Sequence, residues 1–387
     1  MSDVLFQITE DQLETGLRGY PCGYCTTSHV DPQKGLFYLS YPIAELVALE
    51  PEEVIYLLYQ GKKGSKEEVL AFSSDLKARA KLSDTTIKHV QQLPLQGHPM
   101  KLFCAAILIV GMLEGTGDYR EDCLNILAKM PHLVATIMNY HAGWGKTPPP
   151  DPSLGIAESF CHMLQVPHVK EKSLLEAIKL FLILHFDHGG GNLSTFVGKA
   201  VASGLGDMYG SLSAGMCALE GPRHGRANQD CLEFVQSILK EVGENATEKQ
   251  VEDSIRGRLA KNELVFGFGH AVLRVEDARA TVQYDYVQKH YPSHPLVKIA
   301  LHLRAVGPKV LAENPKISNP FPNVDAISGT LLSAAGFPYP EYFTVLFGMS
   351  RCVGIAMQIV YERLEARNGK GTPIVRPKYL YKARGRT

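Results

Sequence analysis

The stretch Thr344–Tyr361 reads TVLFGMSRCVGIAMQIVY, a run whose single charged residue is Arg351. Drawn as a helix, this run is apolar on all sides, and such a helix is stable only when other helices surround it. A second segment, Leu174–Phe186, has the same character. The two segments therefore predict a fold built around centrally buried helices.

Helical periodicity and capping signals extend outward from these segments over most of the chain beyond residue 40. Ser65–Glu68 matches a capping box. Gly61, Gly243 and Gly369 are placed to end helices. One strand-like region, Gly35–Leu39, indicates a small hairpin. We predict an all-α fold with more helices than a simple bundle, over residues 51–60, 66–82, 100–113, 119–140, 172–187, 193–205, 229–242, 248–260, 277–290, 296–313, 325–335 and 342–367.

The 387 residues carry equal numbers of basic and acidic side chains, 40 of each. This balance argues against a dedicated nucleic-acid binder, which would carry a basic excess. The charge is unevenly spread, because residues 367–387 contain seven basic and no acidic residues, whereas residues 1–366 contain 33 basic and 40 acidic. Residues 1–366 are therefore mildly acidic, and the C-terminal segment is basic. The chain is long enough for two or three domains.

No segment predicts a membrane span or a targeting signal. The most apolar run, Leu102–Leu113, has twelve residues, whereas a spanning helix needs about twenty. The first residues, MSDVLFQITEDQLE, are acidic, unlike a secretory signal or a transit peptide. Eight cysteines are too sparse for a disulfide framework, and Cys22–Cys25 is a lone C-x-x-C without thioredoxin-like context. We expect a reduced, cytoplasmic protein.

Three glycine-rich breaks between helices carry histidines, in HFDHGGGN (185–192), GPRHGRAN (221–228) and FGFGH (266–270). In the first, His185 and His188 share a helix face as a metal pair would, but hydrogen-bonded core histidines fit equally well. The second places two arginines at a helix N-terminus, which suits an anion, although an ordinary polar loop would look the same. The third lacks the preceding strand and third glycine of a dinucleotide fingerprint.

Two residues outside these breaks could also carry chemistry. Asp325 opens a helix, where aspartate is a favoured N-cap, so its position alone favours a structural role. Arg351 lies on one polar stripe with Thr344 and Gln358. A buried arginine needs an anion, and either a structural carboxylate or a bound one would satisfy it. Together the histidines, the aspartate and the arginines suit acid–base chemistry on a carboxylate-bearing substrate.

In their order along the chain, these motifs resemble those of the citrate synthase family. The matching segments are DHGGGN (187–192), GPRHGRAN (221–228), FGFGHAVLRVEDAR (266–279), PNVDAISG (322–329), FGMSRCVG (347–354) and VRPKY (375–379). The resemblance runs from about Gly16 to Lys378, and the AVLR sequence after His270 is more similar to the mitochondrial type than to the hexameric bacterial type.

This resemblance implies a si-type citrate synthase that condenses acetyl-CoA with oxaloacetate and hydrolyses citryl-CoA, with no metal and no cofactor besides the acetyl-CoA substrate. Asp325 would remove a methyl proton, His224 would donate a hydrogen bond to the thioester oxygen, and His270 would polarise and protonate the ketone. The oxaloacetate site would comprise His188, Arg279, Arg351 and, across a homodimer interface, Arg376. The CoA site would comprise Arg274, Arg18, Lys316 and the backbone at Leu264, Val265 and Gly267.

The resemblance also implies a large helical domain, residues 1–223 and 332–387, and a smaller domain, residues 224–331, that closes over the site. The nearest alternative is a 2-methylcitrate synthase using propionyl-CoA, because one methylene changes discrimination by only about 1–3 kcal/mol. A zinc hydrolase using His185, Asp187 and His188 is a more distant alternative, as is an acyl-CoA-binding relative without turnover. Arg223 and Arg226 flank His224 where the family usually has apolar or small residues.

Overall fold

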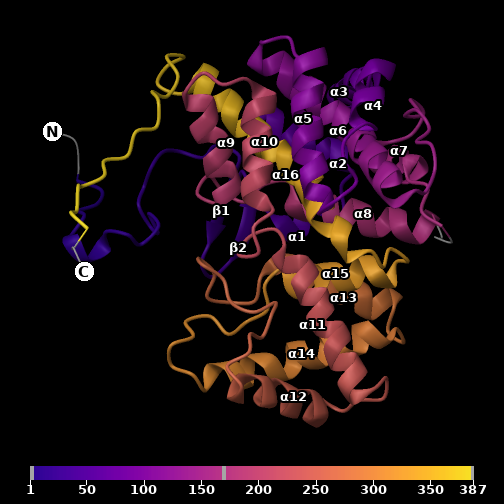
Figure 1. The fold of residues 1–387 in the computed structure, drawn as a ribbon, viewed down its shortest axis with the longest axis vertical. Coiled ribbons are helices and arrows are strands. Elements are labelled where there is room, and N and C mark those ends of the chain that lie inside the picture. Colours follow the sequence, from indigo (N-terminus) through magenta and orange to yellow (C-terminus); the bar gives the residue numbers. More distant parts are fainter. Residues whose placement is uncertain (1–3, 168–170, 385–387) are drawn as a thin grey trace.

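A computed structural model describes residues 4–167 and 171–384 (Figure 1). At its centre lies α16 (Phe343–Val360), in which every residue is buried. The segment Pro340–Glu365 is long and apolar enough to cross a membrane, yet its apolar window is wholly buried inside the protein. The predicted central helix is therefore confirmed, and the segment is a core helix of the kind that other helices enclose.

The second predicted core helix, α8 (Glu171–His185), is buried on all sides only from Leu180 onward. Within the predicted segment Leu174–Phe186, Glu176 is exposed and Leu175 and Lys179 are half-buried, so the prediction of burial on all sides is wrong for residues 174–179. Larger helices that lie around α16 and α8 are α2 (Pro51–Gln60), α3 (Lys66–Arg79), α5 (Pro99–Glu114), α6 (Tyr119–Ala142) and α9 (Leu193–Ser203). The all-α prediction is confirmed.

Four helices were not predicted: α1 (Ile43–Leu46), α4 (Asp84–Val90), α7 (Ile156–Met163) and α10 (Met208–Leu219). Three are short, and α10 is rich in glycine and serine, which are weak helix formers. Tertiary packing stabilises α10, because its small residues let it approach α9 closely. A Cβ at Gly215 would lie 2.9 Å from the Ser194 carbonyl oxygen, and one at Gly198 would lie 3.1 Å from the Ser211 carbonyl oxygen.

A second group of helices lies together at one end of the molecule in Figure 1. It consists of α11 (Ala227–Val242), α12 (Glu248–Ala260), α13 (Ala278–His290), α14 (Pro295–Ala312) and α15 (Asp325–Ala334). Within this group α11 packs on α15 and α12 packs on α14. The segment before α11 and the loop between α12 and α13 reach the larger group, since His224 contacts Ser194 of α9 and the His270 ring lies beside that of His188 after α8.

The predicted hairpin is confirmed as part of a small antiparallel sheet of β1 (Ser28–Asp31), β2 (Gly35–Tyr38) and β3 (Tyr41–Pro42). Gly35 adopts φ +94° at the turn, a conformation that favours glycine. The Tyr38 hydroxyl donates a hydrogen bond to the Ile183 carbonyl oxygen (2.7 Å) and accepts one from the Asp187 N–H (3.1 Å). The sheet thereby holds the C-terminal end of α8 and the loop that follows it.

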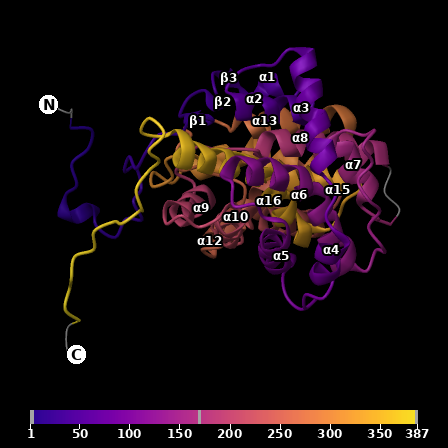
Figure 2. The same cartoon turned by 90° about the horizontal axis from the view of Figure 1, so that it is seen from above.

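Both terminal segments leave the helical body on the same side, as Figures 1 and 2 show. The C-terminal segment passes the end of α9, where the Val375 N–H donates to the Ser203 hydroxyl (2.9 Å). Beyond that point Tyr379 and Tyr381 are 90% and 93% exposed. The N-terminal segment is also apolar and exposed, with side chains such as Leu5 and Ile8 in solvent.

Candidate active site

Five segments that are distant in the sequence meet where the two groups of helices join. They are the loop after α8, the loop before α11, the loop between α12 and α13, the start of α15 and the middle of α16. The rings of His188 and His270 lie 5.3 Å apart between centroids, and those of His224 and Phe347 lie 6.4 Å apart. The structure therefore brings the predicted catalytic histidines to one junction.

Hydrogen bonds between two loops fix His270 relative to Asp325. The Asn323 side chain donates to the Gly269 carbonyl oxygen (2.9 Å) and accepts from the Asp325 N–H (3.0 Å). Gly267 and Gly269 have φ of +82° and +85°, and a Cβ at Gly267 would lie 2.8 Å from Ala326 Cα. The alternating glycines are thus required by backbone conformation and by packing on α15.

The tautomer of His270 follows from its backbone contacts. Its Nδ1 accepts hydrogen bonds from the N–H groups of Val272 and Leu273, both at 3.0 Å. Because Nδ1 accepts, the ring proton of the neutral imidazole lies on Nε2. Burial, assisted by the positive charge of Arg279, lowers the pKa of His270 to about 4. His270 is therefore a neutral Nε2–H donor near neutral pH.

His224 has the opposite tautomer. Its Nε2 lies 3.3 Å from the Ser194 backbone N and 2.9 Å from the Ser194 hydroxyl. A backbone N–H is a fixed donor, so Nε2 is the acceptor and the proton lies on Nδ1. Burial, with a smaller contribution from the Arg351 charge, lowers the pKa of His224 to about 4. His224 thus offers an Nδ1–H donor and carries no positive charge.

Asp325 is not the N-cap that its position suggested. It is the first residue of α15, and Asn323 accepts the hydrogen bond from its N–H. The Asp325 side chain is half-buried, and its Oδ1 atom is shielded from solvent and has no hydrogen-bond partner in the part of the chain that the structure describes. Burial raises the pKa of this carboxyl to about 7, although the charges of Arg279 and Arg351 oppose that shift. A carboxylate with such a pKa is suited to general base catalysis.

We expect kcat to rise with pH along a limb centred near pH 7. The carboxyl of Asp325 must be deprotonated to accept a proton, and its pKa of about 7 means that the active fraction grows through that pH. The pKa values of about 4 for His224 and His270 keep both rings neutral throughout. The measurement is kcat at saturating substrate from about pH 5.5 to about pH 9. A limb centred below about pH 5 would contradict the raised pKa.

Arg351 is a buried cation without an acidic partner in the described part of the chain. Its Nε donates to the His185 carbonyl oxygen (3.0 Å), and its guanidinium lies 4.8 Å from the centroid of the Phe347 ring. Burial lowers its pKa to about 10, so it remains charged at neutral pH. Of the two partners that the sequence left open, these contacts favour a bound carboxylate over a structural one.

Arg279 has a different environment. It forms a buried ion pair with Asp277 (2.6 Å), which holds the pKa of that carboxyl below its usual range. Its guanidinium also donates to His188 Nε2 (3.2 Å). Arginine can only donate, so His188 is neutral with its proton on Nδ1, and burial lowers its pKa well below the usual value. Asp277, which orients Arg279, was not predicted as a site residue.

Asp187 holds the loop after α8 in place through its hydrogen bonds. This structural role was not predicted from the sequence. Its carboxylate accepts from the His188 N–H and from Gln358 Nε2, both at 2.9 Å, and from the hydroxyls of Thr27 and Ser28. A sequence signal for this role was Gln358, because a buried amide on the same polar stripe of α16 as Arg351 needs a hydrogen-bond partner. Of the three glycines that follow, Gly189 has φ +72°, and a Cβ at Gly190 would lie 2.9 Å from Lys199 Nζ, whereas a Cβ at Gly191 would meet no atom within 4 Å.

The ligand set of a zinc hydrolase does not form from the predicted residues. The His185 ring stacks on Phe181, and its Nδ1 lies 2.7 Å from the Phe181 carbonyl oxygen. Asp187 is engaged with the sheet and Gln358, and His188 with Arg279. Within residues 4–167 and 171–384, no group of three or more His, Cys, Asp or Glu side chains is arranged to hold a metal ion.

Five of the predicted CoA residues belong to the loops before α13 and after α14. Arg274, Lys316 and Leu264 are exposed, and Val265 and Gly267 are half-buried. A cavity of about 630 Å³ opens between α12 and α14 next to them, lined in part by Asn262, Glu263, Pro315 and Ile317. Arg18 and Arg376 are exposed on the terminal segments. Within residues 4–167 and 171–384, no hydrogen bond or ion pair joins either of them to the site.

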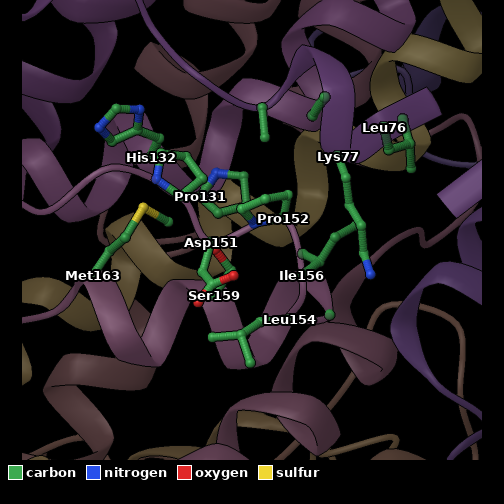
Figure 3. Close-up of a pocket in the computed structure, with 14 residues that line it drawn as sticks. Leu76, Lys77, Pro131, His132, Asp151, Pro152, Leu154, Ile156, Ser159 and Met163 are labelled. Carbon is green, nitrogen blue, oxygen red and sulfur yellow. The ribbon is translucent and has the colours of Figure 1, made fainter. Parts of the chain in front are cut away.

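Two further features lie outside the cluster of catalytic side chains. Arg226 pairs with Asp230 on α11 (3.4 Å), and Arg223 is exposed. The pocket in Figure 3 lies among α3, α6 and α7, lined by apolar residues together with Lys77, His132, Asp151 and Ser159. None of the predicted catalytic residues lines it, so it is not the site described above.

Comparison with known proteins identifies one family. Residues 16–378 match the family model described as citrate synthase, C-terminal domain. The chain is 36% identical to the mitochondrial citrate synthase of Citrus maxima over an aligned length of 401. The alignment covers 97% of this chain and 83% of that protein. The crystal structure of citrate synthase from Thermotoga maritima has a TM-score of 0.81 at 25% identity, with 96% of both chains covered.

A second solved structure has the same fold. It is citrate synthase from the archaeon Thermoplasma acidophilum in a ternary complex with carboxymethyl coenzyme A and oxaloacetate. Its TM-score is 0.83 at 24% identity, with 96% of both chains covered.

Proposed function

Because this chain belongs to the citrate synthase family, we propose that it condenses acetyl-CoA with oxaloacetate and hydrolyses the resulting citryl-CoA to citrate and CoA. One observation carries the proposal: a carboxyl with a pKa near 7 and two neutral imidazoles of opposite tautomer meet at a single junction. These are the groups that enolisation of a thioester and its addition to a ketone require.

The side chains divide the proton transfers between them. Asp325 takes a proton from the acetyl-CoA methyl group, and the Nδ1–H of His224 stabilises the negative charge on the thioester oxygen. The enolic carbon then bonds to the ketone carbon of oxaloacetate, while the Nε2–H of His270 protonates the ketone oxygen. Water then adds to the thioester carbonyl carbon, the C–S bond breaks, and the CoA sulfur takes one water proton while the other is released from the new carboxyl group. Transfer of the proton held by Asp325 to His270 restores both side chains. Each step uses groups of the chain and its two substrates, so we propose no cofactor and no metal, with acetyl-CoA as a substrate.

Oxaloacetate binding rests on the arginines. We propose that Arg351, which has no acidic partner in the described residues, binds one carboxylate of oxaloacetate. Arg279, oriented by Asp277, contacts the substrate together with His188. Neutral His188 adds no repulsive or attractive charge of its own, so the two guanidiniums supply the electrostatic attraction. Their planar donors suit bidentate contacts with carboxylates.

CoA is proposed to bind along the exposed loops of the small group of helices. Arg274 and Lys316 offer solvent-facing cations for the phosphates of CoA, and the backbone at Leu264, Val265 and Gly267 offers donors and acceptors for the adenine. Because these loops belong to residues 224–331, we propose that this part closes over the site as a smaller domain, against the larger domain formed by residues 1–223 and 332–387. Closure would exclude water from the enolic intermediate.

A homodimer is proposed from the distribution of exposed apolar side chains. Helices α5, α9 and α10 pack side by side. α5 exposes Met112 at 76%, and α9 exposes Leu193 at 54%. Both terminal segments extend beyond this part of the body and expose further apolar side chains. A second copy would cover these surfaces, and its tail would bring Arg376 to the site. Arg18 would approach CoA in the same way.

A mixed dimer tests the proposed sharing of Arg376. We expect Arg376→Ala and Asp325→Asn homodimers to be nearly inactive. Unfolding and refolding the two variants together should restore about a quarter of wild-type activity, because half the dimers are mixed and each contains one complete site. Activity per mixture is measured against a wild-type sample refolded in the same way. If mass spectrometry shows that mixed dimers have formed and the mixture recovers no activity, Arg376 does not act across the interface.

The acyl substrate is tested by thiol release. We expect free CoA thiol to appear from acetyl-CoA only when oxaloacetate is present, in the presence of a chelator as well as without it. Release independent of oxaloacetate would contradict the proposal. The same assay with propionyl-CoA separates the nearest alternative, since a higher kcat/KM for propionyl-CoA would identify a 2-methylcitrate synthase.

The cytoplasmic location expected from the sequence stays a prediction. The Citrus maxima relative is a mitochondrial enzyme.

A further inference from the structure

Asn228 is a buried amide that the reaction described above does not use. It is the second residue of α11, four positions after His224, and its side chain is 0% exposed. Neither its Nδ2 nor its Oδ1 has a hydrogen-bond partner within the described residues. Most buried polar groups in folded proteins are paired, so a buried amide unpaired at both ends needs an explanation.

The amide lies against the helix that carries the proposed base. A Cβ built on Gly329 would lie 3.0 Å from Asn228 Oδ1 and 3.0 Å from Leu232 Cβ. Gly329 is four residues after Asp325, so both lie on the same side of α15. One turn further along α11, Cys231 faces the start of α15, since a Cβ at Gly267 would touch both Cys231 Sγ and Ala326. The side of α11 that carries Asn228 therefore faces the side of α15 that carries Asp325.

Asp325 has an unpaired atom of its own in this interface. Its Oδ1 is shielded from solvent and has no hydrogen-bond partner in the described residues, as is true of both amide atoms of Asn228. The other charged or titratable groups near this carboxyl are Asp277 and Arg279 from α13, Arg351 from α16 and Cys231 from α11. Of these, none forms a hydrogen bond with Asp325 in the structure.

From this geometry we propose that Asn228 is a positioning residue that hydrogen-bonds the Asp325 carboxyl group during turnover. The inference rests on the proposed role of Asp325 as the base. An amide suits this task because it carries both a donor and an acceptor. Its Nδ2–H donates to Oδ1 while Asp325 is a carboxylate. After a half-turn of the amide, its Oδ1 accepts from the carboxylic acid that forms when Asp325 has taken the methyl proton.

The test replaces Asn228 with leucine, which has a similar shape and no polar atoms. We expect kcat to fall about 10- to 100-fold, as is typical of losing a hydrogen bond to a charged group. The rising limb of the kcat–pH profile should move up by about one pH unit, because removing a donor disfavours the carboxylate form. The Tm of the free enzyme should be equal to or above that of the wild type, since a buried unpaired amide is replaced by an apolar group.

Matched variants separate this role from a structural one. Asn228→Ala introduces no additional bulk and should show the same upward shift of the rising limb. It serves as the test if the leucine variant folds poorly. Ser328→Ala removes a buried hydroxyl on α15 that donates to the Val324 carbonyl oxygen (2.7 Å), and it should leave the limb in place. Oxaloacetate affinity, measured by calorimetry, should change less than about threefold in all three variants, because neither Asn228 nor Ser328 is among the residues proposed to bind that substrate.

Two outcomes would overturn the inference. The first is a rising limb of the kcat–pH profile that has the same midpoint in both Asn228 variants as in an active wild type. Such a result would show that Asn228 does not act on Asp325, whatever the Tm values are. An equal shift in Ser328→Ala would show a general packing effect. A wild-type enzyme without oxaloacetate-dependent thiol release would instead refute the proposed function, and the inference would fall with it.

Discussion

Replacing Asp325 with asparagine is expected to lower kcat by about 10³- to 10⁴-fold while leaving oxaloacetate binding largely intact. The methyl group next to a thioester is a very weak acid, and a positioned general base contributes about 10²- to 10⁴-fold to such a proton transfer. The amide of asparagine keeps the shape of the side chain and cannot take the proton. Steady-state kinetics and calorimetric titration with oxaloacetate measure the two effects separately.

The same variant should be at least as stable as the wild type at neutral pH. Burial raises the pKa of Asp325 from its ordinary value to about 7, so the folded protein disfavours the charged form. A raised carboxyl pKa means that stability declines as pH rises between about 4 and about 7, and asparagine removes that decline. A Tm that falls together with loss of oxaloacetate binding would instead indicate that Asp325 has a structural role at the start of α15.

Replacing His224 with glutamine is expected to lower kcat by about 10²- to 10³-fold, the typical effect of removing one preorganised donor to a developing oxyanion. The Ser194 contacts assign the acceptor to Nε2 and the donor to Nδ1. Glutamine can replace the contact with Ser194 but has no donor at the position of Nδ1. The KM for oxaloacetate should change little, because the proposed contact of His224 is with the thioester and not with oxaloacetate.

His224→Asn is the matched control for that assignment. The asparagine amide reaches the position of Nδ1 and can donate there, although it loses the contact with Ser194. We therefore expect the asparagine variant to keep more activity than the glutamine variant. The reverse order in kcat would show that the donor to the substrate is Nε2 and that the assigned tautomer is wrong.

Much of the fold was predictable because burial leaves a clear pattern in the sequence. The run around Arg351 is apolar on all sides, which predicts a core helix, and the structure buries every residue of α16. Prediction failed where tertiary contacts override local preference. α10 persists despite its glycines because they permit close packing on α9. The predicted helix over residues 66–82 ends at Arg79, since the Ser83 side chain caps a separate helix, α4.

The sequence predicted some residues of the candidate site and missed the roles of others. The histidines at glycine-rich breaks and Arg351 were identifiable from residue type and pattern, and the structure brings them together. Asp187 was considered only as a possible metal ligand, and Asp277 was not identified. The reason is that their importance lies in a contact with Gln358, 171 positions away, and in orienting a neighbouring arginine. The tautomers of His224 and His270 depend on backbone N–H groups, which have no signature in the sequence.

The most direct test of the central claim follows the acetyl carbons. Acetyl-CoA labelled with ¹³C in its methyl group is incubated with the enzyme and oxaloacetate, and the products are identified by mass spectrometry. The proposed mechanism predicts labelled citrate in amounts equal to the CoA released, and about 10³- to 10⁴-fold slower citrate formation by the Asp325→Asn variant. Labelled acetate in place of citrate would show that the enzyme hydrolyses the thioester without forming a carbon–carbon bond, which would contradict the account.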